Sequence, residues 1–189
     1  MRTGYKAAID LALTELEKLA PADVCSRTGC TYENGAYSIP WFGEKSTITE
    51  GSEWDQIVKL HYLTSKGASK PSQTLISYRE VPSALFYEPK FIARAVRPVV
   101  KTFGANAKDL ITAAAAIQGT QAPHGDAAVT LTPLPNIQIT YILWQGDDEF
   151  PPDGNILFDK NSIDWLPAED LVVLASIASY KLLQIAKKP

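Results

Sequence analysis

The chain has 189 residues, of which 46% are hydrophobic and 21% charged, and its formal net charge is −3. This composition is ordinary for a folded domain with a sizeable core. Acidic and basic residues are well mixed without a basic stripe, which argues against nucleic acid as a partner. No apolar run approaches the roughly 20 residues of a membrane span, and residues 1–19 are amphipathic, unlike a signal peptide. We therefore expect a cytoplasmic protein that does not bind membranes.

The first part of the chain is predicted to contain a helix followed by short strands. Apolar residues recur at helical spacing over residues 5–19, so we expect a helix there that Pro21 ends. Over residues 29–50 the pattern changes to that of strands. Asn34 and Gly35 lie between two strand-like runs and are typical of a hairpin turn, because both central residues of that turn need positive φ. This segment is predicted to form a three-stranded meander.

The middle of the chain is predicted to be mainly helical. Ser52 is a typical helix N-cap, and a helix is expected over residues 53–66. A short strand at residues 74–79 precedes a longer helical stretch, residues 88–103, which contains Pro98. Because proline lacks the backbone N–H and its ring clashes with the preceding turn, Pro98 should kink this stretch or end its first half.

The last part of the chain combines strands with a final helix. Residues 107–117 should form a helix rich in small side chains, and residues 127–131 and 137–144 an antiparallel pair of strands. The second strand is strongly apolar, so we expect it at the centre of a sheet. Pro167 opens the last helix, and the acids that follow it suit the positive end of the helix dipole.

The order of these elements predicts the fold class. Strands occur in antiparallel groups with helices between the groups, without regular βαβ alternation or a glycine-rich dinucleotide turn, which argues for α+β. We expect a single domain, residues 1–189, with an antiparallel sheet flanked by about five helices. Its predicted segments are an N-terminal helix (1–20), a β-meander (29–50), a mainly helical part (52–119), antiparallel strands (126–159) and a C-terminal helix (167–187).

Two cysteines, Cys25 and Cys30, are the only ones in the chain, which also has only two histidines, His61 and His124. A structural zinc site normally needs four Cys or His ligands at tight paired spacing, and the sequence lacks that pattern. A disulfide is not expected in a reducing compartment. We therefore interpret the cysteines as two small residues near the edge of a sheet.

An acidic segment follows the most apolar strand. Asp147, Asp148 and Glu149 lie between that strand and a second apolar run that ends at Asp159. Because alternate residues of an extended chain point the same way, Asp147 and Glu149 could converge on a hard cation, with Asp153 or Asp159 as a third ligand. The alternative, which we favour, is a solvated turn.

Arg79 follows Tyr78 at the end of the short strand and has two interpretations. Its guanidinium could clamp a carboxylate or phosphate of a ligand. It could also form a structural ion pair with Glu149 or Asp147, which we favour, because a partly buried acidic turn needs a compensating charge. We expect that turn at a sheet end, near the start of the last helix.

The histidines and aromatic residues are the other candidates for a site. His61 lies on the apolar stripe of its helix, where a half-buried structural role is favoured. His124 lies in a turn beside Asp126, where it could bind a metal or act as a base, although a plain turn is favoured. Aromatic side chains that end strands, such as Trp144, could line a cavity for a large planar ligand, although a core role is favoured. The aromatic set is Tyr32, Tyr37, Trp41, Phe42, Tyr62, Tyr78, Phe86, Tyr87 and Trp144.

Five segments together resemble an uncharacterised bacterial and archaeal family, domain of unknown function 3786. They are LHYL at 60–63, SYREVPSALFYEPKF at 77–91, GDAA at 125–128, LPNIQITYILWQGDDEFPPDGNILFD at 134–159 and WLPAEDL at 165–171. The resemblance implies an association with anaerobes, with iron–sulfur segments fused to some members and with corrinoid or methyl-transfer systems. It implies no reaction and no catalytic residues. This chain has no ferredoxin-like run of cysteines.

Three classes of function follow from these observations. We favour a non-catalytic cytoplasmic accessory or ligand-binding protein of anaerobic cofactor or methyl-group metabolism, with a corrinoid or another tetrapyrrole as the candidate cofactor. The first alternative is a metal-dependent hydrolytic enzyme, because a bound metal lowers the pKa of its water. The second is a protein-interaction module that presents an apolar face to a partner protein.

The candidate residues differ between these classes. No catalytic residue can be assigned from the sequence. The candidate ligand-binding residues are Tyr78, Arg79, Trp144, His61 and His124. The candidate metal ligands are Asp147, Glu149 and Asp159.

Overall fold

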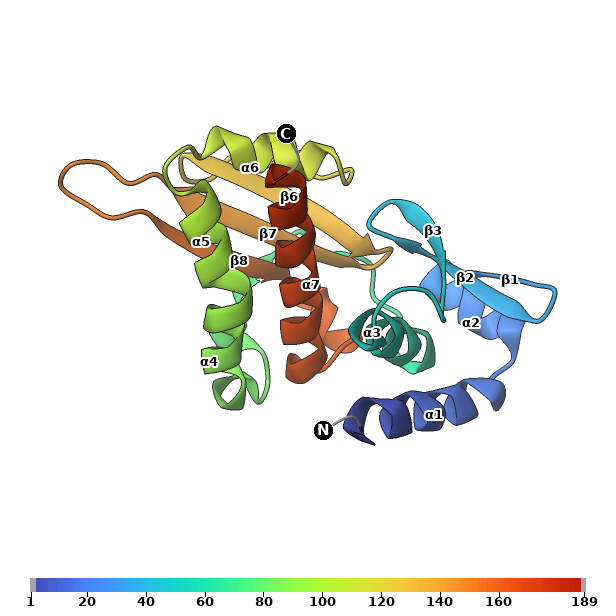
Figure 1. Cartoon of the computed structure of the whole chain (residues 1–189). Coiled ribbons are helices and arrows are strands. Elements are labelled where there is room, and N and C mark those ends of the chain that lie inside the picture. Colours follow the sequence, from blue (N-terminus) through green and yellow to red (C-terminus); the bar gives the residue numbers. More distant parts are fainter. Residues whose placement is uncertain (1–2, 188–189) are drawn as a thin grey trace.

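Two antiparallel sheets and a layer of helices make up the computed structural model, which describes residues 3–187 (Figure 1). The helices are α1 (Thr3–Glu17), α2 (Pro21–Thr28), α3 (Glu53–Thr64), α4 (Glu88–Phe91), α5 (Arg97–Phe103), α6 (Lys108–Ala115) and α7 (Ala168–Ala186). The strands are β1 (Thr31–Glu33), β2 (Ala36–Trp41), β3 (Glu44–Thr47), β4 (Leu75–Ser77), β5 (Thr120–Gln121), β6 (Ala127–Leu134), β7 (Ile137–Trp144) and β8 (Asp153–Asp159). This is the predicted α+β fold class.

The larger sheet has five strands in the order β4-β8-β7-β6-β5, and every neighbouring pair is antiparallel. β7 lies at its centre, as its apolar sequence predicts. The helices α4 to α7 cover one face of this sheet (Figure 1). β6 is longer than predicted, because pairing resumes at Leu134 after a shift of register between Leu131 and Leu134.

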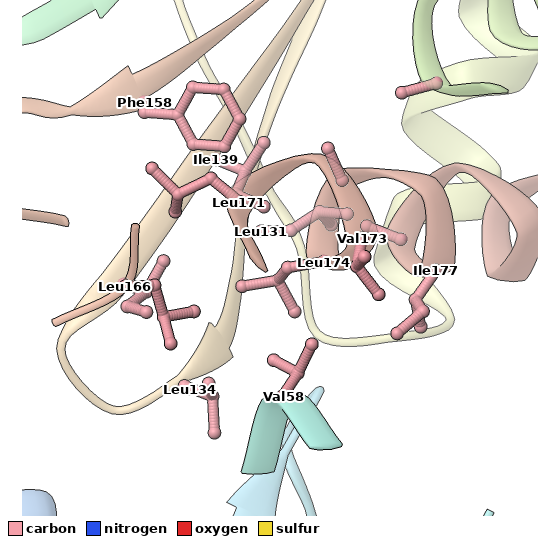
Figure 2. Packing of buried hydrophobic residues seen from close by; sticks show 14 of the residues in the cluster. Val58, Leu131, Leu134, Ile139, Phe158, Leu166, Leu171, Val173, Leu174 and Ile177 are labelled. Atoms are coloured by element: carbon pink, nitrogen blue, oxygen red, sulfur yellow. The ribbon is translucent and has the colours of Figure 1, made fainter. Parts of the chain in front are cut away.

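The core lies between this sheet and α7. Leu171 and Leu174 of α7 point toward Ile139 and Phe158 of the sheet, and Val58 of α3 approaches α7 from the other side (Figure 2). All five side chains are buried. Burying one such side chain contributes about 1.5–3 kcal/mol to the free energy of folding. The cluster therefore holds both the sheet and α3 against α7.

The predicted meander forms the smaller sheet, of order β1-β2-β3. Asn34 and Gly35 form its first turn with φ of 52° and 79°, the positive values expected from the sequence. The fully buried Lys59 of α3 ties the meander to the helix, because its ammonium donates to the carbonyl oxygens of Thr47 (2.6 Å) and Glu50 (2.7 Å). Phe42 extends the contact to the larger sheet, since its N–H donates to the Pro133 carbonyl (3.0 Å).

Two helical segments differ from the expected boundaries. Pro21 was expected only to end a helix, but it also begins α2, since proline suits the first turn, where an N–H has no partner. Residues 88–103 form a continuous stretch in which the turn Ile92–Val96 is a π-helix. Pro98 follows it and cannot donate to the carbonyl of Arg94, so the wider turn absorbs the missing hydrogen bond. Pro98 therefore does not end the helical stretch, which instead changes to π geometry in the turn before the proline.

Candidate functional site

The largest cavity with mainly apolar walls lies on the helical layer, between α3, the π-turn and α7. Its volume is about 620 Å³. We call it the α3–α7 cleft. Its lining residues are Ser52, Glu53, Trp54, Arg94, Ser176, Ile177 and Tyr180.

One wall of the cleft is the first turn of α3. Ser52 caps this helix, because its hydroxyl accepts from the Asp55 N–H while the Asp55 carboxylate accepts from the Ser52 N–H (2.8 Å). The cap fixes the direction in which the helix starts and therefore the position of Trp54. The Trp54 ring is half-buried and lies 6.4 Å, between ring centroids, from Tyr5 of α1. The cap of α3 and the contact with Tyr5 thus hold the Trp54 ring in place at the cleft.

The π-turn supplies the cation of the cleft. Its extra residue changes the direction of the side chains in this turn, and such turns occur frequently at functional sites. The guanidinium carbon of Arg94 lies 5.3 Å from the centroid of the Trp54 ring, a cation–π distance. Within residues 3–187 Arg94 forms no ion pair. Its hydrogen-bond donors are therefore free to bind an anion from solution.

The middle of α7 forms the opposite wall. Ile177 is buried at the floor of the cleft, and Tyr180 is 63% exposed at its rim. The Ser176 hydroxyl donates to the Val172 carbonyl (2.7 Å), so it is already satisfied by its own helix. The walls therefore offer apolar and aromatic surface together with one cation, Arg94, and one carboxylate, Glu53. This combination suits a ligand with a flat apolar part and an anionic group.

A second polar feature, the His61–Asp170 pair, lies along the same two helices. His61 is seven residues after Trp54 and Asp170 is seven residues before Ile177, so the pair lies about 10 Å along the helices from the cleft. The imidazole Nδ1 and the Asp170 Oδ2 are 2.7 Å apart. This hydrogen bond raises the pKa of His61, while partial burial opposes the rise.

Residues near the start of α7 are fixed by further hydrogen bonds. The Tyr87 hydroxyl donates to Glu169 (3.1 Å), which raises the pKa of that phenol. The buried Tyr78 hydroxyl donates to the Ala168 carbonyl (2.9 Å), and the Tyr78 ring stacks on Phe91 with centroids 4.4 Å apart. Tyr78 is therefore a core residue that secures the first turn of α7.

The five predicted ligand-binding residues do not gather in one cavity. Tyr78 and Arg79 line a smaller cavity of about 360 Å³ beside the start of β8. Trp144 ends β7, opposite Asp153, and is 43% exposed. His124 is exposed in the turn before β6. His61 lies apart from these residues, in its pair with Asp170.

The predicted ion pair of Arg79 is wrong. Arg79 pairs with Glu88 of α4, and its own side chain is largely exposed. The acidic turn lies at a sheet end, as predicted, but its predicted place near the start of the last helix is wrong. The turn joins β7 to the first residue of β8, whereas the last residue of β8 leads toward α7. The Gly146 N–H donates to the Gly104 carbonyl (3.1 Å), so the turn lies against the end of α5.

The three predicted metal ligands are separated by the length of β8. Asp147 and Glu149 precede the strand, and the Asp147 carboxylate accepts from the N–H groups of Glu149 (2.9 Å) and Phe150 (2.7 Å), which lowers its pKa. Asp159 ends the strand and is fully buried. Within residues 3–187 no group of three or more Cys, His, Asp or Glu residues is placed to hold a metal ion.

A core role, the interpretation favoured from the sequence, holds for most of the aromatic set. Tyr37, Trp41, Phe42, Tyr62 and Tyr78 are buried. Trp54 and Tyr180, which line the α3–α7 cleft, were not recognised as site residues. The sequence did mark the two elements that carry this cleft. The cap residue Ser52 marks the turn that holds Trp54, and Pro98 marks the irregular turn that holds Arg94.

The fold and this site define an α+β protein with an open antiparallel sheet, helices on one face and an apolar cleft in the helical layer. The chain belongs to the family described as domain of unknown function (DUF3786), whose sequence model matches residues 20–181. No curated protein and no solved structure matches the chain. Among the described helices, none has the length and apolar character needed to cross a bilayer.

Proposed function

We propose that the protein is a non-catalytic, cytoplasmic accessory protein that binds a small molecule in the α3–α7 cleft. The ligand would have a flat apolar part and an anionic group. The observation that carries this proposal is the free cation of Arg94, held over the Trp54 ring at the rim of an apolar cavity of about 620 Å³. Arginine forms forked hydrogen bonds with carboxylates, and an aromatic wall favours a planar partner.

A corrinoid or another tetrapyrrole is the first ligand class to test. Tetrapyrroles present the broad face of a conjugated ring and carry carboxylate or amide side chains at its edge, which suits the chemistry of Trp54, Tyr180 and Arg94. The link that the family resemblance implies with anaerobic cofactor and methyl-group metabolism points to the same class. Smaller aromatic carboxylates satisfy the same chemistry and form the comparison group.

A binding role is favoured over a catalytic one because Glu53 is the one carboxylate among the lining residues of the cleft, and the hydrogen-bonded His61–Asp170 pair lies apart from it. His61 and Asp170 lie about 10 Å along α3 and α7 from the Trp54 end of the cleft. General acid–base catalysis needs a donor or acceptor within hydrogen-bond reach of the reacting atom. The anionic group of a ligand that Arg94 binds would lie beyond hydrogen-bond reach of the His61–Asp170 pair.

The test is a titration of the protein with haem, cobalamin and a planar aromatic sulfonate, followed by absorbance and by quenching of tryptophan fluorescence. Arg94→Gln should weaken binding by about tenfold or more, because a hydrogen bond to a charged group contributes about 1.5–3 kcal/mol. Arg97→Gln is the matched control, since Arg97 is exposed on the same helical stretch and does not line the cleft.

The outcomes separate the parts of the proposal. Binding of the sulfonate but of no tetrapyrrole would keep the cleft and remove the cofactor class. Equal affinities for the wild type, Arg94→Gln and Arg97→Gln proteins would place the binding site elsewhere. No binding of any of the three probes would contradict the proposed function.

A further inference from the structure

The two cysteines of the chain meet at the end of α2. Cys25 lies in the last turn of this helix, and Cys30 immediately precedes β1. Between them Gly29 adopts the left-handed conformation (φ 75°, ψ 17°), and its N–H donates to the Cys25 carbonyl (2.9 Å). This turn reverses the chain and brings Cys30 back over the helix end. The two Sγ atoms lie 2.7 Å apart.

This separation is less than 1 Å longer than a covalent sulfur–sulfur bond, which measures about 2.05 Å. The thiols therefore need only a small adjustment of their side-chain torsions to reach bonding distance. They differ in access, because Cys25 is half-buried and Cys30 is only 6% exposed. A reagent from solution can thus reach the Cys25 sulfur, and the Cys30 sulfur is buried next to it.

The backbone that carries the two thiols is fixed by neighbouring contacts. The Arg27 guanidinium donates to the carbonyl oxygens of Leu63 (3.1 Å) and Ser65, at the end of α3. The buried Thr28 hydroxyl donates to the Val24 carbonyl (2.8 Å) and accepts from the Cys30 N–H (3.4 Å). These contacts of α2 therefore hold the two sulfur atoms close together.

We propose that Cys25 and Cys30 are a site of reversible oxidation, at which a low-molecular-weight disulfide such as glutathione disulfide converts them into an intramolecular disulfide. The Cys25 thiolate attacks one sulfur of glutathione disulfide, forms a mixed disulfide and releases one glutathione thiolate. Cys30 loses its proton to solvent and attacks the Cys25 sulfur, which breaks the mixed disulfide and releases the second glutathione. Two cysteine thiols are oxidised and one glutathione disulfide is reduced.

The surroundings of the pair set the rate of this exchange. Burial and the neighbouring Cys30 raise the pKa of Cys25 to about 12. Two titratable side chains from other elements interact with the pair, Tyr37 of β2 and Tyr62 of α3. Burial and both thiols raise the pKa of Tyr37, and burial and Cys30 raise that of Tyr62. Since the thiolate is the nucleophile, oxidation should be slow at neutral pH and should accelerate as pH rises.

The test equilibrates the native full-length protein with a series of glutathione and glutathione disulfide mixtures, followed by acid quenching and intact mass measurement. The oxidised wild type should lose the mass of two hydrogens without forming a dimer. Cys30→Ala should accumulate one glutathione on Cys25, because the second step is blocked. Cys25→Ala should remain unmodified, because Cys30 is buried.

A second readout follows the fold. Closing the short loop between residues 25 and 30 should raise the thermal midpoint of the oxidised wild type by about 4–8 °C, and dithiothreitol should reverse the rise. The Cys25→Ala, Cys30→Ala double variant should show no response to either reagent. Two free thiols at every glutathione ratio, a stable glutathione adduct on the wild type, or a disulfide-linked dimer would each overturn the proposal.

Discussion

The two ends of β8 carry carboxylates in opposite surroundings. Asp159, at the end that leads to α7, is fully buried and accepts from the N–H groups of Ser72 (3.0 Å), Gln73 (2.6 Å) and Asn161 (2.9 Å). Asp147, beyond the other end, is exposed and accepts only from its own turn. Burial of a charge needs full compensation, so the same residue type organises the structure at one end and merely shapes a turn at the other.

This difference extends beyond the two carboxylates. At the end near α7, Tyr78 bonds the first turn of the helix and Asp170 pairs with His61. At the far end Asp148, Glu149 and Phe150 are exposed. Polar side chains near the start of α7 therefore hold elements together, and the carboxylates of the acidic turn do not. Substitutions at the two ends should accordingly differ in cost.

The largest effect is expected from Asp159→Asn. The amide keeps one acceptor but places a donor against one of the backbone N–H groups that the carboxylate now satisfies. Leaving buried donors unsatisfied costs about 1–3 kcal/mol each, so we expect a loss of roughly 3 kcal/mol. The thermal midpoint should fall by about 6–12 °C for a chain of this size.

Asp153→Asn is the matched control for this substitution, because Asp153 begins β8, is exposed and accepts only from the adjacent Gly154 N–H (2.8 Å). Its midpoint should stay within roughly 2 °C of the wild type. Thermal unfolding followed by circular dichroism measures both variants. Equal midpoints for the two variants would remove the contrast between the ends of β8.

A smaller loss is expected from Tyr78→Phe. The substitution removes a buried hydrogen bond to the Ala168 carbonyl (2.9 Å) but leaves that oxygen within the first turn of α7. One hydrogen bond of this kind contributes about 1 kcal/mol, which corresponds to roughly 2–4 °C in thermal midpoint. Tyr32→Phe is the control, because Tyr32 is 44% exposed on the smaller sheet. A midpoint unchanged in Tyr78→Phe would mean that the hydroxyl does not secure α7.

The His61–Asp170 pair should make stability depend on pH. Because Asp170 raises the pKa of His61 in the folded state, the folded protein holds this proton more tightly than the unfolded chain. The stabilisation is complete below pH about 6.5, the ordinary pKa of histidine, and is lost as pH rises through the higher pKa of the folded state. Urea unfolding between pH 5 and 9 should reveal this loss.

The matched variants for the pH experiment are His61→Gln and His124→Gln. His61→Gln should remove the loss of stability in this pH range, whereas His124→Gln, in an exposed turn, should retain it. A wild-type stability that rises from pH 6 to pH 8 and is insensitive to His61→Gln would show that the pair does not form.

The sequence predicted those features that are encoded locally. The central place of β7 follows from its apolar run, the first hairpin from Asn34 and Gly35, and the start of α3 from Ser52. α2 was missed because Pro21 was interpreted only as the end of a helix. The general lesson is that proline carries information on both sides of its position.

The candidate site could not be predicted from local patterns. Trp54 and Tyr180 are 126 positions apart, and only the packing of α3 against α7 places them on one cleft. The predicted ion-pair partner of Arg79 was wrong for the same reason. The actual partner, Glu88, lies on a helix whose direction the sequence does not specify. Pairwise contacts of charged residues depend on tertiary placement, whereas strand order and caps depend on neighbours in the chain.

The smallest effect is expected from the acidic turn. Asp147→Asn keeps the oxygen that accepts from Glu149 and Phe150, and the Glu149 side chain is exposed, so Asp147→Asn and Glu149→Gln should each leave the urea midpoint nearly unchanged. Because backbone N–H groups lower the pKa of Asp147, its contribution is present above its unfolded pKa and is lost as pH falls through the folded value. The double variant should show additive changes in urea unfolding. A gain of stability well above 1 kcal/mol in either variant would indicate that the turn holds strained, repelling carboxylates, and would make this end of β8 a functional site after all.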